Sequence, residues 1–411
     1  MSSHNERGGH SYSSKRREYL WDGLKPGLLQ SIEQPQDVLD GSVVELSNIT
    51  YIGSYNWVDA ESPTIIVPGY PRVWVDRPLP YTVLPDRGWQ FINQNRHRLP
   101  QTPLLPLITA VNHRYEEGPV DASGITSFDW STVDIVTDRN NLRKLLGWVG
   151  QRAKGKEFRI DLQLAGKKTV LMTGSGWATR EMMRGASYGF NFEKMSTEPA
   201  PGCQSSTSHH RIISYDLQGL CMVVRFEVDA CLSGPSPLTP SASSTSSEPA
   251  AAASSISMNG LASVFGDISI GSDADTPAPR ALTIRRGGSW LTSHESIVEL
   301  TTAKTVVWGR AYPQLLLSNT RHHFRGVHEG GVFTSIRKTE LGTEALRAAD
   351  EELREPMKKL RRLLSTIQTL VKKHGERGRL TLVCKDWVLN VYERKSNAAF
   401  LPDEQMNLFR S

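Results

Sequence analysis

Acidic and apolar residues alternate along the stretch Val223–Ala230. We predict a β-strand here, and because successive strand side chains point to opposite faces, Glu227 and Asp229 share one face. Arg225 shares that face too. The opposite face is apolar and carries Val224, Phe226, Val228 and Ala230. A strand that presents two carboxylates on one side needs a neighbouring group that offsets their repulsion.

A second predicted strand, Ser296–Thr301, carries another acid, Glu299, that can point toward the same side. Neighbouring strands that gather three carboxylates usually do so around a divalent cation. Hard oxygen ligands favour Mg²⁺ or Mn²⁺ over zinc. Such ions activate water and shield the charge of a phosphodiester during hydrolysis. Alternating exposed strands also carry Glu-x-Asp pairs without any catalytic role, so the pair alone leaves both interpretations open.

Composition limits the other possibilities. The chain has 411 residues, 38% of them hydrophobic, a formal net charge of +5 and a pI near 8.9, which permits nucleic-acid binding without demanding it. Its four cysteines form no CxxC pair, and the N-terminus has no secretory signal, so we expect reduced thiols in an intracellular protein. No apolar run is long enough to span a membrane, so we expect no membrane partner. The basic cluster 15–17 fits a nuclear signal or chance equally well, which leaves nucleus and cytoplasm open.

The predicted organisation is one α+β domain around a mixed sheet, interrupted by low-complexity sequence. Residues 1–24 are expected to be a disordered basic N-terminus, and residues 233–279, rich in Ser, Ala, Pro and Thr, a disordered insertion. The single domain comprises residues 25–232 and 280–411. The insertion does not prevent the two acidic strands from pairing, because the entropy of loop closure grows slowly with loop length.

Periodicity predicts the elements of this domain. Helices are expected over 137–149, 178–183, 312–320 and 341–373, the last with a kink or break at Pro356. Hairpins are expected at 158–164 with 169–172, 211–215 with 223–230, 324–336, and 379–383 with 388–392. The aromatic run 188–192 is interpreted as a strand end that packs in the core, although it could also stack bases. In the pairs at 209–210 and 322–323, adjacent histidines are expected to point to opposite faces as surface or partly buried polar residues, not metal ligands.

Four short motifs occur in an order that resembles the decapping exoribonuclease (DXO-like) family. They are Val136–Leu146, with an arginine before a leucine-rich helix, Gly189–Glu193, Glu227–Asp229 and Glu299–Thr301. The segment Trp308–Gly330 is similar to the part of the family that follows these motifs. The segment around Ser54–Trp57 further resembles a group of uncharacterised fungal proteins. Some proteins of that group carry a prenyl-diphosphate-synthase label. The present chain has no DDxxD motif and no all-helical pattern, so its sequence does not support that chemistry.

The resemblance implies a fold, an activity and a set of site residues. It implies a PD-(D/E)XK nuclease-type core that acts on RNA 5′ ends with Mg²⁺ or Mn²⁺. The implied metal ligands are Glu193, Glu227, Asp229, Glu299 and the Leu300 carbonyl. Arg139 would bind a substrate phosphate, and Gln314 would orient the attacking water or the substrate.

Two positions depart from the family pattern. Thr301 replaces a lysine whose charge would hold the phosphate and stabilise the transition state, and Phe190 replaces a tyrosine. Lys304 is close by but has the opposite strand parity, so it can replace the lysine only if the strand ends first. We therefore carry two hypotheses: a metal-dependent decapping phosphodiesterase, and a degenerate nuclease fold that binds RNA or a protein partner. A positive group near Glu299 would favour the enzyme.

Overall fold

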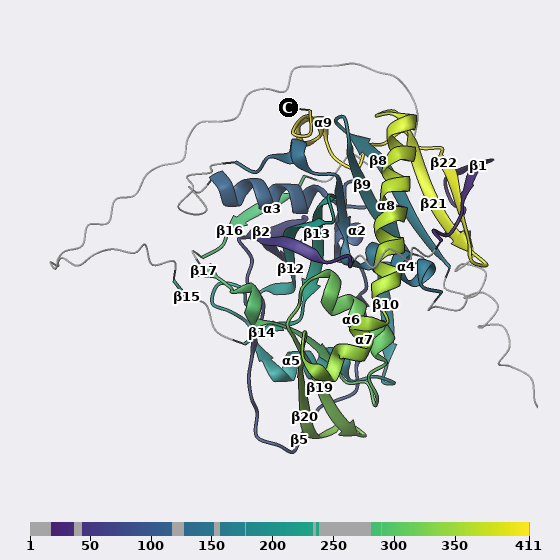
Figure 1. Ribbon diagram of the computed structural model, residues 1–411. Coiled ribbons are helices and arrows are strands. Elements are labelled where there is room, and N and C mark those ends of the chain that lie inside the picture. The colour runs from purple at the N-terminus through teal and green to yellow at the C-terminus, as the bar shows by residue number, and fades with distance from the viewer. Residues whose placement is uncertain are drawn as a thin grey trace, which may run out of the picture.

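Two β-sheets form the framework of the computed structural model (Figure 1). The structure describes residues 18–36, 43–116, 127–151, 157–176, 178–232, 236–237, 281–288 and 290–410. Among these, the larger sheet has 11 strands and the smaller one seven. Parallel and antiparallel pairs occur in both sheets, which confirms the expected mixed-sheet α+β class. No helix in the described ranges is long and apolar enough to cross a membrane.

The larger sheet carries three of the four predicted hairpins, and the fourth, at 324–336, lies in the smaller sheet. In spatial order its strands are β1 (Leu24–Ile32), β22 (Val388–Arg394), β21 (Arg379–Lys385), β8 (Phe158–Ala165), β9 (Thr169–Ser175), β7 (Ile135–Asp138), β13 (Cys221–Val228), β12 (Ser206–Leu217), β2 (Leu46–Val58), β3 (Thr64–Val67) and β16 (Thr283–Arg286). Strands β8 and β9 are buried along nearly their whole length, because both faces of the sheet are covered.

Helices cover both faces of this sheet. One core cluster joins one sheet face to α4 (Arg139–Val149) and α8 (Arg354–His374), and contains Val224, Phe226 and Val228. A second cluster joins the other face to α3 (Leu105–Glu116) and to the C-terminal segment with α9 (Asp403–Asn407). The apolar face predicted for β13 is therefore the one beneath α4 and α8.

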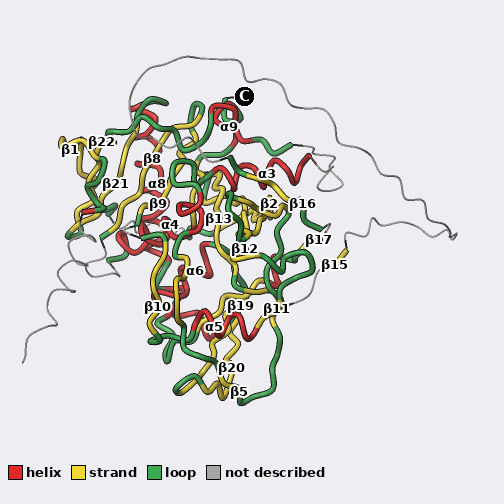
Figure 2. Tube along the Cα trace, turned by 180° about the vertical axis from the view of Figure 1, so that it is seen from behind, coloured by secondary structure: helices red, strands yellow, loops and turns green. Residues whose placement is uncertain are grey.

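The smaller sheet lies below the larger one, and Figure 2 shows the same separation from behind. In spatial order its strands are β11 (Thr197–Glu198), β4 (Val73–Trp74), β14 (Ala230–Cys231), β18 (Ile297–Thr301), β19 (His322–Glu329), β20 (Val332–Glu340) and β5 (Tyr81–Thr82). Its core packs aromatic rings beneath α5 (Gly189–Ser196), where Phe192 stacks on Phe333 with ring centroids 4.7 Å apart. Next to it, α6 (Trp308–Leu317) carries Gln314.

The remaining elements are short. They are β6 (Arg87–Phe91) with β10 (Arg180–Arg184), β15 (Ser236–Pro237) with β17 (Trp290–Leu291), α2 (Gln94–Arg98), α7 (Arg347–Glu351), and three 3₁₀ turns at Trp130–Thr132, His294–Ser296 and Glu344–Leu346.

Two predicted elements differ from the structure, and a third has the break that the sequence predicted. The segment expected as a helix at 178–183 is instead strand β10, because it pairs with β6, a partner some ninety residues earlier in the chain. The aromatic run expected at a strand end lies in helix α5, whose first amides donate to the distant Asp86. The helix expected over 341–373 is broken just before Pro356, which lies in the first turn of α8.

The expected disordered segments lie mostly outside the described residues. Residues 1–17 and nearly all of 233–279 are not described. At the N-terminal boundary, however, residues 18–24 are ordered, and Leu20 is fully buried against Leu24 and Val383. The ordered domain therefore begins earlier than the predicted residue 25.

Candidate functional site

The acids lie where the chain passes from the larger sheet to the smaller one. Strand β13 ends at Val228, β14 begins at Ala230, and Asp229 is the residue between them. Strand β14 pairs antiparallel with β18 through Ala230 and Val298. This pairing brings Glu299 next to the crossing, which confirms that the two acidic strands are neighbours.

Asp229 also fixes the adjacent backbone. Its Oδ2 accepts a hydrogen bond from the Leu300 amide at 2.8 Å. In a strand the N–H and C=O of one residue face the same neighbour. The Leu300 carbonyl is therefore directed toward the side on which Asp229 lies, as a ligand role would need.

The fourth acid reaches the same region from a helix. Glu193 projects from α5, and the start of α5 is held by the Asp86 carboxylate, which accepts from the Asn191 amide at 2.8 Å and the Phe190 amide at 3.3 Å. The Phe190 contact uses backbone only, so the hydroxyl that the family tyrosine would add is not needed to place Glu193.

The pKa values of Glu193, Glu227 and Asp229 indicate that these acids and Glu299 lie close enough to raise one another's pKa. Burial, and then the charges of Glu227 and Glu299, raise the pKa of Glu193 to about 8. Burial raises the pKa of Glu227 to about 7, with Glu299 adding to the rise and Arg139 opposing it. Burial, Glu299 and Glu193 raise the pKa of Asp229 well above its ordinary value. Glu227 nevertheless keeps contact with solvent.

Glu299 is held by two polar neighbours. Arg139 Nη1 lies 3.2 Å from Glu299 Oε2, and Gln314 Nε2 donates to Glu299 Oε1. The same Arg139 nitrogen lies 3.1 Å from Ser318 Oγ, and the guanidinium lies over the Phe226 ring, 5.3 Å from its centroid. The structure thus brings Arg139, Gln314 and Glu299 together, as the resemblance implied.

The donor set suits a hard cation in chemistry, but the side chains are not gathered around one point. Carboxylate and carbonyl oxygens are what Mg²⁺ and Mn²⁺ prefer. Within the described ranges, however, no three His, Cys, Asp or Glu side chains are close enough together to hold a metal ion. Glu299 is turned toward Arg139. A cation bound by Glu299 would compete with Arg139 for this carboxylate.

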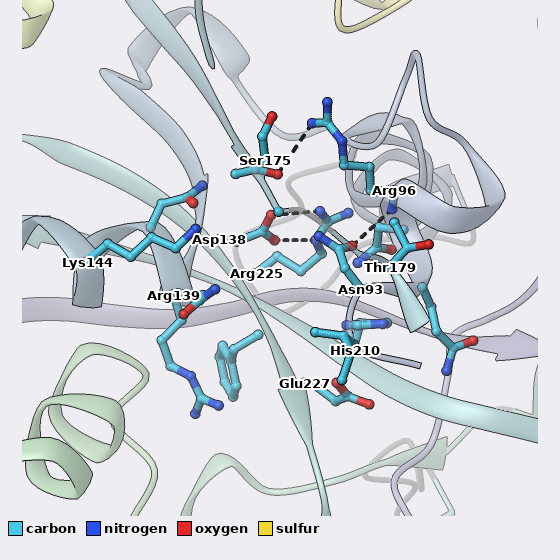
Figure 3. Close-up of a pocket in the computed structure, with 18 of the residues that line it drawn as sticks. Asn93, Arg96, Asp138, Arg139, Lys144, Ser175, Thr179, His210, Arg225 and Glu227 are labelled. Atoms are coloured by element: carbon cyan, nitrogen blue, oxygen red, sulfur yellow. Dashed lines mark hydrogen bonds and ion pairs between the residues drawn. The ribbon is translucent and has the colours of Figure 1, made fainter. Parts of the chain in front are cut away.

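A basic groove of about 240 Å³ adjoins the acids and shares Glu227 with them (Figure 3). Its cationic side chains are Arg96, Arg139, Arg143, Lys144 and Arg225, the last paired with Asp138. Burial lowers the pKa of Lys144 to about 8 and that of Arg143 to about 10, with Arg139 lowering Arg143 further. Sequence reasoning missed these cations except Arg139 and Arg225. Arg143 and Lys144 lie within the motif Val136–Leu146, but nothing in the sequence marks Arg96 as their neighbour.

Arg225 shares the acidic face as predicted, yet its charge is already paired. Its guanidinium binds both oxygens of Asp138, at 2.6 and 3.1 Å, and donates to Tyr55 Oη and the Pro103 carbonyl. Only 1% of its side chain is exposed. Arg225 therefore holds β13 to the start of α4, and its charge is not available to offset those of the acids.

The histidines at 209–210 point to opposite sides, as predicted, but both are buried more deeply than the surface or partly buried positions that were predicted. His209 hydrogen-bonds Asn56 at 2.6 Å and lines a small cavity with Glu193 and Asp229, whereas His210 lies against the Tyr55 ring and lines the basic groove. Burial lowers the pKa of each well below its ordinary value. Both are therefore neutral at physiological pH.

The position of the missing lysine has a cationic neighbour. Thr301 ends β18, and its register partner on β19 is Arg325, just as Glu299 pairs with His323. Paired positions two apart lie on one sheet face, so Arg325 and Glu299 share a face. Arg325 Nη1 donates to the carbonyls of Ala303 and Lys304, which places its guanidinium at the turn after β18. Because β18 ends before Lys304, the parity argument against that lysine does not apply, and its side chain is exposed.

Comparison with solved structures shows a decapping-exonuclease-like fold. Rai1 from Scheffersomyces stipitis is 10% identical with a TM-score of 0.53, and the match covers 94% of this chain and 99% of that chain. A mutant Rai1 from S. pombe in complex with 3′-FADP is 12% identical with a TM-score of 0.52, over 89% and 99% of the two chains. Rai1 from Candida albicans, in complex with pU5-Mn²⁺, is 12% identical with a TM-score of 0.51, over 92% and 98%.

These likenesses confirm the expected fold relationship and extend over most of the chain. None of the curated protein sequences that were compared matches this one. One family model matches residues 28–409, nearly the whole ordered chain. The chain therefore belongs to the family described as Domain of unknown function (DUF8563).

Proposed function

We propose that this protein is a metal-dependent hydrolase of the decapping type that acts on the phosphates of RNA 5′ ends. One observation carries the proposal: a cluster of mutually repelling carboxylates adjoins a basic groove, and Glu227 belongs to both. Acids that raise one another's pKa are suited to binding a divalent cation, whereas the groove is suited to a polyanion. Nuclease and pyrophosphohydrolase reactions both need a site for a divalent cation and a surface that binds the phosphates of the substrate.

Within this proposal the acids hold Mg²⁺ or Mn²⁺, with the Leu300 carbonyl as a further ligand. The ion would lower the pKa of an attacking water and neutralise charge on the phosphate. Once Glu299 turns toward the ion, Arg139 is free to bind phosphate oxygens with its planar guanidinium. Gln314, which touches Glu299, is placed to orient the water or the substrate.

Arg325 supplies the positive group that the family lysine would provide. It lies on the Glu299 face beside Thr301, and the carbonyls of Ala303 and Lys304 hold it there. A fixed cation at this point stabilises the charge that develops on the phosphate. The similar Rai1 complex with pU5-Mn²⁺ is consistent with RNA and Mn²⁺ as ligands of this chain too.

A second candidate is a degenerate nuclease fold that binds RNA or a protein without turnover. Two observations favour it: Thr301 in place of the lysine, and the ion pair that holds Glu299 away from a common metal point. In either case we place the activity in one domain formed by residues 18–232 and 280–411.

The deciding experiment incubates the purified full chain with Mg²⁺ or Mn²⁺ and RNAs that carry a triphosphate, an unmethylated cap or a nicotinamide nucleotide at the 5′ end. We expect release of the 5′ group, and its loss in Asp229→Asn, which keeps an acceptor for the Leu300 amide but removes the charge. Glu404→Gln, an exposed acid on α9, is the matched control and should retain activity. Turnover no higher than that of Asp229→Asn for every end group, with RNA binding intact, would establish the degenerate module instead.

A further inference from the structure

A two-stranded ribbon stands apart from both sheets and forms a rim of the site. Strands β6 and β10 pair only with each other among the described strands. One end of the ribbon leads into the wall of the basic groove, where the Ile92 and Asn93 amides donate to the Thr179 carbonyl. At the other end Asp86 accepts from the start of α5, the helix that carries Glu193. The ribbon therefore spans the distance from the groove to the acids.

One face of this ribbon is basic and aromatic. The directly opposed pairs on that face are Arg184 with Arg87, Met182 with Trp89, and Arg180 with Phe91. Because directly opposed residues share a face and alternate positions change face, all six side chains lie on one side. The opposite face carries the pairs Glu181 with Gln90 and Met183 with Gly88.

The aromatic group on this face is unusually accessible. Trp89 is 60% exposed, and Arg180 lies over its ring, 5.4 Å from the centroid. Arg87 and Arg184 are also exposed. A large ring left in solvent among three arginines is a platform on which bases stack while the arginines hold phosphates.

We propose that this ribbon face binds the unpaired RNA that follows the 5′ end. The protein would then contact single-stranded RNA beyond the reacting phosphates. The inference rests on the proposed function for the location of the 5′ end, but it concerns a separate surface. Its charge and exposed ring match a single strand: a duplex would offer the arginines phosphates but no base to Trp89. Each strand of the ribbon is five residues long, roughly 17 Å when extended, which is sufficient for a few nucleotides.

The test measures RNA binding by the full chain as a function of RNA length. Single-stranded RNAs with a 5′-monophosphate, either a dinucleotide or about ten nucleotides long, carry a fluorophore at the 3′ end, and Asp229→Asn is present throughout to prevent cleavage. Trp89→Ala should weaken binding of the longer RNA roughly tenfold, because it removes one stacking contact. The triple variant Arg87→Gln, Arg180→Gln and Arg184→Gln should lower the slope of log affinity against log salt by about two. Neither variant should change dinucleotide binding.

A charge-matched control distinguishes the ribbon from general electrostatic attraction. Lys372→Gln, Lys373→Gln and Arg377→Gln remove the same charge from the exposed end of α8 and the turn that follows it, and should leave both affinities unchanged. The inference is overturned if the ribbon variants bind the longer RNA as the control does, or lose the dinucleotide equally. It is also overturned if the parent protein binds a ten-nucleotide duplex as tightly as the single strand. If the parent protein binds neither the dinucleotide nor the longer RNA, both the ribbon inference and the proposed function fail. This result differs from the outcomes above, which overturn the ribbon inference alone.

Discussion

Replacing Glu193 by glutamine should make the metal-free protein more stable at high pH. Burial and the neighbouring Glu227 and Glu299 raise the pKa of Glu193 from 4.5 to about 8. Its ionisation therefore opposes folding. The contribution of Glu193 to stability is fully present below pH 4.5 and is lost as the pH rises through about 8.

The size of the effect follows from the shift. Each pKa unit corresponds to about 1.36 kcal/mol, so complete ionisation of Glu193 would cost at most roughly 5 kcal/mol. Glu193 is only half-buried, and water reaches part of its side chain, so we expect about 2 kcal/mol to be realised. Glutamine keeps the shape of the side chain and has no charge to lose.

Urea denaturation at pH 5, 7 and 9 with a chelator measures this difference. Between pH 5 and pH 9 the unmodified protein should lose about 2 kcal/mol more unfolding free energy than Glu193→Gln. Glu198→Gln, an exposed acid a few residues away, should follow the unmodified protein. Added Mn²⁺ should stabilise the unmodified protein at pH 7 more than Glu193→Gln. Parallel pH profiles for the unmodified protein and Glu193→Gln would refute the shared acidic space.

Three further substitutions probe other contacts. Arg225→Met should lower the unfolding free energy by roughly 2–4 kcal/mol in urea titrations, because it leaves the partly buried Asp138 without its partner and the Pro103 carbonyl without a donor; a loss under about 1 kcal/mol would contradict this. Arg325→Ala should reduce release of the 5′ group by about 10²-fold in a turnover assay, whereas substitution of the exposed Lys304 by alanine should have little effect. The opposite ranking would identify Lys304 as the residue that replaces the family lysine. Gly326→Ala should destabilise the smaller sheet by roughly 1–3 kcal/mol by calorimetry, because its Cβ would lie 2.6 Å from a ring under α5; an unchanged melting temperature would show that the rings can shift.

Many of the strands and helices could be predicted because they depend on the local spacing of polar and apolar residues. Alternation identified β13 and β18 and the faces of their acids, and helical spacing identified α4. The elements that were wrong depend on distant partners. The segment 178–183 has helix-forming residues, but pairing with β6 made it a strand, and Asp86 holds the amides that begin α5.

The sequence by itself determined the order of the acidic motifs, the faces on which Glu227 and Asp229 lie, and the substitution at Thr301, since strand periodicity and residue identity need no partner. Only the tertiary structure decided how their charges are balanced. It pairs Arg225 with Asp138, turns Glu299 toward Arg139, and places Arg325 beside Thr301. Each of these contacts joins residues far apart in the chain. Their energies depend on burial and on distances of a few ångströms, which local sequence does not encode.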